Sequence, residues 1–453
     1  MIPRSRKPGL TRRTFLRGAA VAAGACAAPA FRVLGAERSG GKLNIACVGV
    51  GGRGGAHLSG CQDENIVALC DVDSDNIARA AKKFKRAKAF ADFRVMLDKM
   101  EKDIDAVTIA VPDHSHYPVA MACMQRGKHV LIEKPLTQTV WEARTLRQAA
   151  HKYNVFHQMG NQGHATDHIR AAKEWFEAGV LGDVKEVHAW NGGPKEHYFG
   201  NPQSYPPPGS PVPPSLDWDL WLGPRAFRPH STAYVPRTWR GWWNFGNGPL
   251  GDWGCHTLDL PFWSLNLDGP VSVEAKVGPV RFPQYIPAWA IVTWEFPARG
   301  ALPPVTVTWY DGGKRPEPPV GAAEMKVKAS GMYMVGSKAT LMTGGRPNHD
   351  LCLTETEKFQ ALKQNQPART IPRVKGGHWA EWTRAIKGNG PKPGSSFDYA
   401  VPLSQMLLLG GIAERVPGRK LLWDNDAGMF TNSPEANALL KSPPRKGWEF
   451  DLT

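Results

Sequence analysis

The stretch that decides the fold is residues 43–56, which read LNIACVGVGGRGGA. It starts with a short apolar run that is typical of a buried strand. Gly49, Gly51 and Gly54 follow with the spacing G-x-G-x-x-G, and a helix-like segment comes directly after them. A second apolar run then ends at Asp71. A strand, a glycine-rich turn, a helix and an acid closing the next strand together predict a dinucleotide-binding site.

Each residue type in this loop has a physical task. The first glycine makes the tight turn, the second lets backbone N–H groups approach a pyrophosphate, and the third lets the helix pack close to the strand. Gly52 and Arg53 complete the predicted cofactor-binding loop. Asp71 is placed to accept hydrogen bonds from ribose hydroxyls and to repel a 2′-phosphate, which favours NAD over NADP. NADP stays as the alternative, because Arg53 could lie beside either a 2′-phosphate or the pyrophosphate.

Strand-like and helix-like segments continue to alternate along the first third of the chain. The runs 106–111, 128–132 and 155–159 are apolar, and a helix with alternating charges lies between the last two. We therefore predict a doubly wound parallel sheet in a domain spanning 41–160. The segment 112–116 is predicted to be a loop at a strand's carboxyl end, where ligands bind in open α/β sheets.

The remaining residues, 161–453, have a different pattern of strand-like and helix-like segments. Their strand-like runs lack intervening helices of adequate length, which indicates a mainly antiparallel sheet. These runs are 184–190, 271–277, 291–296, 305–309 and 332–335. Residues 201–240 are rich in Pro and Trp, and we expect an ordered excursion there because aromatic side chains need burial.

Several motifs now stand in one order: the glycine loop, Asp71, the Pro112–His116 segment, Glu133-Lys134-Pro135, and Asp252 followed four residues later by His256. In this order and spacing the sequence resembles the Gfo/Idh/MocA oxidoreductases, the family of glucose–fructose oxidoreductase and inositol dehydrogenase. The resemblance covers most of residues 42–270. It implies an α/β Rossmann dinucleotide-binding domain followed by an α+β C-terminal domain with an open, mainly antiparallel sheet. It also implies a homo-oligomer, a dimer or tetramer, built on the exposed face of that sheet.

The resemblance assigns roles to particular residues. Lys134 would lie between the nicotinamide ribose and the substrate hydroxyl, His256 would be the general base, and Asp252 would orient the imidazole or contact the substrate. Pro112, His116 and Glu133 would join the cofactor site. The residue types suit these tasks, because a histidine can exchange protons near neutrality and a lysine can stabilise a developing alkoxide.

Candidate substrate contacts lie around the expected crevice between the domains. Gln162 and His164 follow the last strand of the first domain. Trp253 belongs to a group with Trp239, Trp242 and Trp243 just before His256. Aromatic faces stack well on sugar rings, so we expect one or two of these four tryptophans to contact a carbohydrate or cyclitol substrate.

The N-terminus carries a separate signal. Residues 1–36 contain the pair Arg12 and Arg13, followed by Phe-Leu and a run of small and apolar residues. This order resembles a twin-arginine export signal, with cleavage expected after Ala30 or Ala36. It implies the twin-arginine machinery as a partner, a periplasmic or otherwise exported protein, and a cofactor bound tightly before export.

Charge and cysteine usage exclude several other classes. The formal charge is +15, but residues 1–36 hold seven positive charges and no acid, which leaves +8 for the rest. No nucleic-acid motif is present, so we expect no nucleic-acid partner. After the leader no apolar run is long enough to predict a membrane span. The six remaining cysteines have irregular spacing without CxxC, so we expect no metal site.

The sequence therefore predicts an exported NAD(P)-dependent oxidoreductase that oxidises a secondary hydroxyl of a sugar or cyclitol by hydride transfer. One alternative is an NAD-dependent glycoside hydrolase, in which transient oxidation of a ring hydroxyl permits elimination of the leaving group. A second alternative is a sugar- or cofactor-binding protein without turnover. The presence of Lys134, Asp252 and His256 argues against that second alternative.

Overall fold

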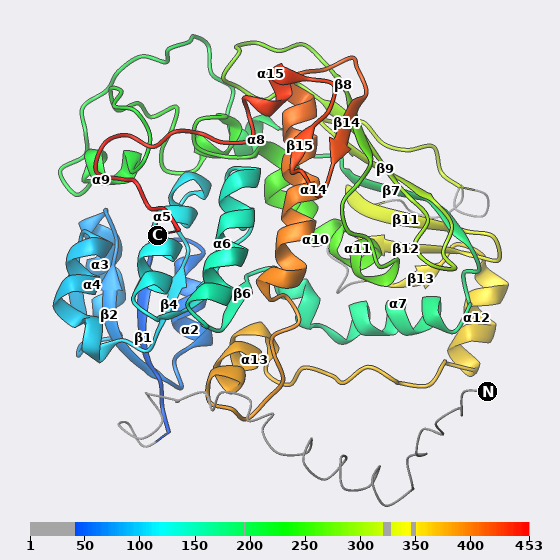
Figure 1. Ribbon diagram of the computed structural model, residues 1–453, viewed down its shortest axis with the longest axis horizontal. Helices are drawn as coiled ribbons and strands as arrows, with labels where there is room; N and C mark the ends of the chain where they lie inside the picture. Colours follow the sequence, from blue (N-terminus) through cyan, green and yellow to red (C-terminus); the bar gives the residue numbers. More distant parts are fainter. Residues whose placement is uncertain (1–40, 194, 320–327, 346–349, 453) are drawn as a thin grey trace, which may run out of the picture.

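The computed structural model describes residues 41–193, 195–319, 328–345 and 350–452. Two sheets organise this part of the chain, as Figure 1 shows. The first has six parallel strands in the order β3-β2-β1-β4-β5-β6. Its strands are β1 (Asn44–Val48), β2 (Asn65–Cys70), β3 (Lys88–Phe90), β4 (Ala106–Ile109), β5 (His129–Ile132) and β6 (His157–Met159). The predicted Rossmann sheet is confirmed.

Apolar side chains project from both faces of this sheet, because its strands are almost continuously apolar. On β1, Ala46 and Val48 join a core with helices α4 (Phe93–Met100), α5 (Asp113–Gln125) and α6 (Val140–Lys152). The alternate residues Ile45 and Cys47 pack on the opposite face with α2 (Gly54–Gly60) and α3 (Ser74–Ala81). Helices on both faces leave the carboxyl edge of the sheet as the place for a ligand.

Two helices of the first domain begin at capping residues. Asp73 caps α3 by accepting a hydrogen bond from the Asp75 N–H. Thr139 and Glu142 form a reciprocal capping box at the start of α6. Such caps satisfy backbone N–H groups that have no partner within the helix, and each contributes about 1 kcal/mol.

The predicted loop over 112–116 is wrong beyond Pro112. Helix α5 begins directly at Asp113, and each of its residues except the last, Gln125, is buried. A helix buried all round shows no alternation of apolar and polar faces, so the sequence carried no helical period to detect.

The second sheet has nine strands in the order β13-β12-β11-β7-β10-β9-β8-β14-β15. Only the β7–β10 pair is parallel among the described pairings, so the prediction of a mainly antiparallel sheet is confirmed. The strands are β7 (Val184–Asn191), β8 (Ser272–Val277), β9 (Ala290–Phe296), β10 (Val305–Asp311), β11 (Ser330–Gly336), β12 (Thr340–Gly344), β13 (Cys352–Leu353), β14 (Leu421–Asp424) and β15 (Met429–Phe430). Helices α7 (Asp167–Glu177), α11 (Asp259–Ser264) and α12 (Thr356–Gln364) accompany this sheet.

The C-terminal part of the chain returns to the first domain. Helix α14 (Phe397–Arg415) packs against both α6 and β8, and Figure 1 shows it standing between the two sheets. Helix α13 (Gly377–Ile386) packs against α2. The Tyr117 hydroxyl donates to the Phe450 carbonyl, which ties the last residues to α5. Helix α14, near the end of the chain, thus connects the two sheets.

The Pro- and Trp-rich segment between β7 and β8 is an ordered arm. It contains the short helices α8 (Glu196–Phe199), α9 (Trp218–Leu222), η3 (Thr238–Gly241), η4 (Leu250–Gly254) and α10 (Cys255–Thr257). Trp218, Trp221, Trp239 and Trp242 form the core of this arm with Phe245. The arm reaches the first sheet where the Asp217 N–H donates to the Val72 carbonyl, at 2.8 Å.

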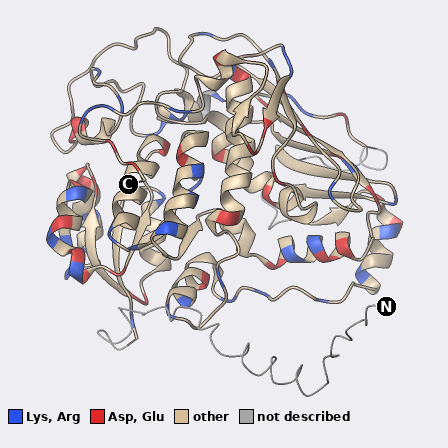
Figure 2. Cartoon of the chain, in the orientation of Figure 1, with Lys and Arg blue, Asp and Glu red and all other residues tan. Residues whose placement is uncertain are grey.

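Figure 2 shows both signs of charge interspersed on exposed helices such as α7 and α12. The six cysteines outside the leader are all free thiols. Within the described ranges, no helix has both the length and the apolar character needed to cross a membrane. The leader, residues 1–36, lies outside the described residues.

Candidate active site

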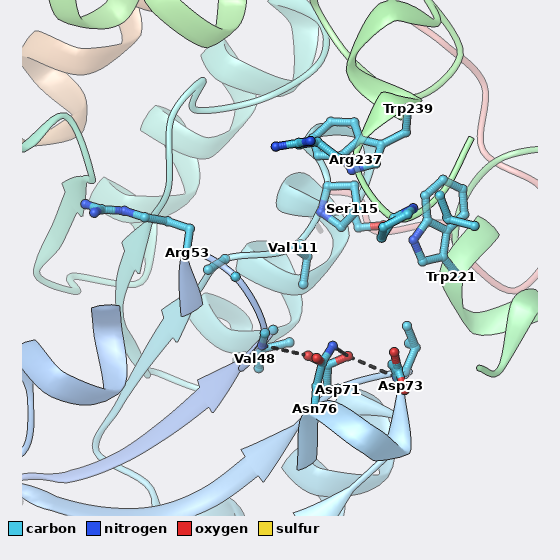
Figure 3. A pocket seen from close by; sticks show the side chains of 18 of the residues that line it. Val48, Arg53, Asp71, Asp73, Asn76, Val111, Ser115, Trp221, Arg237 and Trp239 are labelled. Carbon is cyan, nitrogen blue, oxygen red and sulfur yellow. Dashed lines mark hydrogen bonds between the residues drawn. The ribbon is translucent and has the colours of Figure 1, made fainter. Parts of the chain in front are cut away.

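A cavity of about 940 Å³ lies at the carboxyl ends of β1, β2, β4 and β5, beneath the arm. This volume is at the upper end of the roughly 300–1,000 Å³ found for ligand pockets. Figure 3 shows that Asp71, Asp73 and Asn76 line one side, while Trp221, Arg237 and Trp239 of the arm face them. Twelve predicted site residues line it: Gly49, Gly51, Gly52, Arg53, Asp71, Pro112, Glu133, Lys134, Gln162, Asp252, Trp253 and His256.

The glycine loop is shaped by close contacts that only glycine permits. At Gly49 φ is +77°, and an added Cβ would lie 2.4 Å from the Ala110 carbonyl oxygen. A Cβ at Gly54 would lie 1.9 Å from the Gly49 carbonyl oxygen. Gly54 therefore supports the loop from behind, and Gly51 and Gly52 form the wall of the cavity.

Asp71 closes β2 as predicted, and its carboxylate holds the loop. Its Oδ2 accepts hydrogen bonds from the N–H groups of Val50 at 2.8 Å and Gly51 at 3.2 Å. Its Oδ1 accepts from the Asp73 N–H at 3.0 Å and from the Asn76 side chain at 3.2 Å. The carboxylate therefore fixes the shape of the glycine loop while it also lines the cavity.

Arg53 is tied to the opposite side of the cavity. Its Nε donates to Glu133 Oε1 at 2.7 Å, and Nε2 of the buried His57 lies 3.0 Å from the same oxygen. Burial alone would raise the pKa of Glu133, but the His57 bond and the charges of Arg53 and Lys134 hold it well below its usual range. Arg53 also donates to the Gln162 side chain at 3.4 Å, and both residues line the cavity.

Lys134 and Asp252 form a largely buried ion pair in the wall of the cavity. Lys134 Nζ donates to Asp252 Oδ1 at 2.7 Å and to the Asp252 main-chain oxygen at 2.8 Å. Arg240 Nε lies 3.4 Å from the same Oδ1. Burial opposes both charges, but the charge of Asp252 raises the pKa of Lys134, and the charges of Lys134 and Arg240 lower the pKa of Asp252. Both groups are therefore ionised at neutral pH.

The other residue of the Asp252-x-x-x-His256 motif is also in place. Asp252 lies in the π-helical turn η4 and His256 in α10, and both are buried and line the cavity. The contacts of the Asp252 carboxylate described above run to Lys134 and Arg240. The structure thus gives Asp252 the task of holding Lys134.

His116, predicted to contact the cofactor, is buried and lies outside the described lining of the cavity. Its Nδ1 and Nε2 each lie 2.8 Å from a main-chain carbonyl, those of Pro135 and Val111. Burial lowers the pKa of His116 to about 4, so the ring is neutral at pH 7 and donates to one of these carbonyls. Through its contact with the Pro135 carbonyl, His116 fixes the residue that follows Lys134.

His164, predicted to contact the substrate, is likewise buried. Its Nδ1 lies 2.9 Å from Asp259 Oδ1. The ring packs against Trp263 and Tyr399, and His164 is absent from the described lining of the cavity. Among the four tryptophans near His256, Trp239 and Trp253 line the cavity, whereas Trp242 is fully buried in the arm.

Sequence reasoning missed several lining residues, among them Asp113, Tyr198, Arg237 and Arg240. The guanidinium groups of Arg237 and Arg240 lie 5.5 Å and 5.3 Å from the centre of the Tyr198 ring. Arg240 also stacks on Trp239, at 4.3 Å. The only signal for the arginines was their place among the tryptophans of residues 237–243. Asp113 lay in the 112–116 segment that was predicted to lie near a ligand, but no role was assigned to it.

Comparison with known proteins agrees with this geometry. A family model described as "Oxidoreductase family, NAD-binding Rossmann fold" matches residues 43–161. A second, described as "Oxidoreductase family, C-terminal alpha/beta domain", matches residues 169–300. The two matches together span more than half of the chain. The protein therefore belongs to the Gfo/Idh/MocA oxidoreductase family, and its first domain is an NAD-binding Rossmann domain.

Individual relatives match this chain less completely than the two family models do. Levoglucosan dehydrogenase of Pseudarthrobacter phenanthrenivorans is 30% identical over 26% of this chain and 29% of its own length. Glycosyl hydrolase family 109 protein 2 of a Shewanella species is 30% identical over 30% of this chain and 35% of its own. The chain thus matches about a third of the length of these two relatives. The solved WlbA dehydrogenase of Bordetella pertussis, in complex with NADH and UDP-GlcNAcA, is 16% identical with a TM-score of 0.59, covering 84% of this chain and 99% of that one. At this identity the likeness shows the fold.

The residues present fit NAD. Gly51 and Gly52 leave the loop wall without side chains, and the cavity runs from Asp71 to Lys134 and His256. Acidic residues stand at the β2 end, where Asp71 and Asp73 line the wall. That arrangement suits a ribose with free hydroxyls better than one with a phosphate.

Proposed function

We propose that this protein oxidises a secondary hydroxyl of a sugar or cyclitol and passes the hydride to a tightly bound NAD. The observation that carries the proposal is the buried Lys134–Asp252 pair, which lies with His256 in the same cavity as the glycine loop. A lysine that is charged at neutral pH, a histidine and a dinucleotide loop are the parts that hydride transfer from an alcohol requires.

Each side chain has a defined task in this proposal. Lys134, held charged by Asp252, donates a hydrogen bond to the substrate oxygen and stabilises the negative charge that develops there. His256 accepts the hydroxyl proton. When bound, NAD supplies the acceptor for the hydride. Glu133 and Arg53 keep the Lys134 segment and the glycine loop at a fixed separation through their 2.7 Å ion pair.

The cavity walls support a carbohydrate or cyclitol as the substrate class. Trp239 and Trp253 offer aromatic faces, and Tyr198 lies beside them with the two arginines of the arm. Flat aromatic surfaces suit the C–H faces of a sugar ring, whereas the guanidinium groups suit its hydroxyls.

We further propose that the protein is exported by the twin-arginine route as a homo-oligomer with its cofactor already bound. The Arg12–Arg13 pair and the apolar run after it support export. A mature N-terminus after Ala30 or Ala36, found by mass spectrometry of protein from a periplasmic fraction, would support this route. Protein confined to the cytoplasm with an intact leader would contradict it.

The second candidate is a glycoside hydrolase that uses NAD transiently. The match to glycosyl hydrolase family 109 protein 2 favours it. Oxidation of a ring hydroxyl acidifies the neighbouring C–H, which permits elimination of the leaving group and later re-reduction. The same cavity would serve both reactions, so the net reaction distinguishes them.

The test uses purified protein with no cofactor added. Reduced-nicotinamide absorbance and aglycone release are followed together across a panel of free sugars, cyclitols and aryl glycosides. A dehydrogenase gives a reduced-cofactor band that persists until a carbonyl compound is added. Aglycone release without accumulating reduced cofactor would instead establish the hydrolase, and binding without either signal would leave only a binding protein.

A further inference from the structure

Three buried carboxylates line the cavity around Lys134, and they differ in their partners. Glu133 has Arg53 at 2.7 Å, and Asp252 has Lys134 at 2.7 Å. Asp113 is equally buried, with 6% of its surface exposed. It forms no ion pair with any residue in the described ranges. Its contacts come instead from Asn247, whose N–H and side-chain Nδ2 donate to Oδ2 at 3.1 and 3.2 Å.

We propose that Asp113 is a second acid–base residue of this cavity, which takes up the proton released when the substrate hydroxyl is oxidised. This inference rests on the proposed function above. It gives a role to Asp113, which the sequence analysis placed in the Pro112–His116 segment without assigning it one.

The orientation of the Asp113 carboxylate carries the argument. The Asn247 amide is itself fixed, because its Nδ2 also donates to the Thr137 carbonyl at 3.2 Å. Asn247 therefore holds Oδ2 against the protein. The other oxygen, Oδ1, accepts no hydrogen bond within the described part of the chain, and Asp113 lines the cavity with Lys134 and His256. One oxygen is anchored, and the other is left for an exchangeable proton.

The surroundings give Asp113 a proton affinity that its neighbours lack. Burial raises its pKa to about 7; Asp252 acts in the same direction, while Arg240, Lys134 and the Asn247 hydrogen bond oppose it. Its place as the first residue of α5 also favours the ionised form, so burial is the decisive effect. Lys134 stays protonated and Asp252 stays ionised at neutral pH, so neither exchanges a proton there. A group that titrates near pH 7 suits reversible proton transfer.

The proton balance is simple. The carbinol C–H bond breaks and its electron pair leaves with the hydride for the NAD nicotinamide, while the C=O bond forms. The hydroxyl proton passes by way of His256 to the Asp113 carboxylate, which becomes a neutral acid. In the reverse direction Asp113 returns the proton as a carbonyl is reduced. A protein that retains its reduced cofactor would therefore also retain, on Asp113, the proton needed for that reduction.

The test combines a titration with a rate profile. Protein labelled with ¹³C at the aspartate carboxyl carbons is titrated by NMR, and the Asp113 resonance is assigned by its loss in Asp113→Asn. We expect a midpoint near 7 instead of the ordinary value of about 3.9. The rate of reduced-nicotinamide formation in a single turnover is then measured against pH, with the substrate found by the panel above.

In the wild type, the rate of oxidation should rise as pH increases through 7, because Asp113 must be ionised to accept the proton. This rise is the limb of the rate profile that the variants test. In Asp113→Asn this limb should vanish and the rate should fall about 100-fold. Asn247→Ala removes the side-chain donor to Asp113 Oδ2 and leaves the backbone N–H, so the charged form loses support and the limb should move to higher pH. Asp98→Asn, the same change on the exposed surface of α4, should leave both measurements unaltered.

A midpoint near 4 would overturn the proposal, and so would a wild-type pH limb that survives in Asp113→Asn. If Asp113→Asn fails to bind NADH, Asn247→Ala still decides, because an unmoved limb in that variant contradicts the proposal. Failure of the proposed function looks different: the wild type itself would reduce no cofactor with any member of the panel.

Discussion

Lys134 Nζ contacts Asp252 twice, through the carboxylate Oδ1 at 2.7 Å and the main-chain oxygen at 2.8 Å. The two residues are 118 positions apart, one at the end of a strand in the first sheet and the other in the arm that covers it. This contact therefore joins the cofactor domain to the wall of the substrate cavity. It fixes the lysine both in position and in charge.

Lys134→Ala should lower turnover by roughly 100- to 1,000-fold, because it removes the cation that stabilises the developing alkoxide. NADH should still bind, since the glycine loop is untouched. Fluorescence titration with NADH and steady-state rates measure the two effects separately. Lys134→Arg should remain impaired, because a planar guanidinium cannot take the place of a compact ammonium. A near-normal rate in Lys134→Ala would remove this residue from the chemistry.

Asp252→Asn should make the reaction sensitive to alkaline pH. In the wild type the Asp252 charge raises the pKa of Lys134 against the effect of burial. Without that charge, burial lowers the lysine pKa, so the lysine loses its proton at lower pH. We expect the alkaline fall in rate to move down by at least about one pH unit. An alkaline limb at the wild-type position would contradict the role given to this pair.

Gly51→Ala should weaken NADH binding about tenfold while the protein stays folded. The new Cβ would lie 2.5 Å from the Asn76 side chain, which is held by Asp71. Gly55→Ala is the matched control, since a Cβ there meets nothing within 4 Å and helix α2 should become slightly more stable. Equal NADH affinities in the two variants, measured by fluorescence, would disprove the placement of the cofactor at this loop.

His164→Ala should cost about 1–3 kcal/mol of unfolding free energy, because it leaves the fully buried Asp259 without its imidazole partner. NADH affinity should not change, since His164 is away from the cavity. Denaturant unfolding with NADH titration checks both expectations. His168→Ala, on the exposed face of α7, should be neutral in both. A loss of substrate affinity without loss of stability would restore His164 to the substrate site.

Acid titration should reveal the Glu133 cluster. The pKa of Glu133 is lower in the folded protein than its ordinary value of about 4.3, so its stabilising effect is full above that value. The stability it contributes is lost as pH falls below the ordinary value toward the lower folded pKa. Glu133→Gln should therefore be less stable than the wild type at pH 7, and the difference should shrink below pH 4. A constant difference across that range would show that the charge of Glu133 has no part.

Sequence alone predicted those features of the molecule that are determined by residues close together in the chain. The glycine loop and Asp71 lie within one strand–turn–helix unit, so spacing identifies them. The buried helix α5 has no polar face, so the sequence did not show that a helix begins at Asp113. The partners of His116 and His164 could not be predicted, because the residue type does not reveal whether a ring faces a cavity or main-chain and carboxylate groups. The contact between Lys134 and Asp252 depends on how the arm folds over the sheet, which no local pattern contains.

The central claim is that hydride leaves a substrate carbon for NAD in this cavity. The most direct measurement uses the substrate found by the panel, deuterated at its carbinol carbons, in a single turnover with the wild-type protein. The account predicts reduced cofactor carrying one deuterium at C4 of the nicotinamide, and no such product from Lys134→Ala in the same time. Reduced cofactor without deuterium, or product formed while the cofactor gains no label, would contradict it.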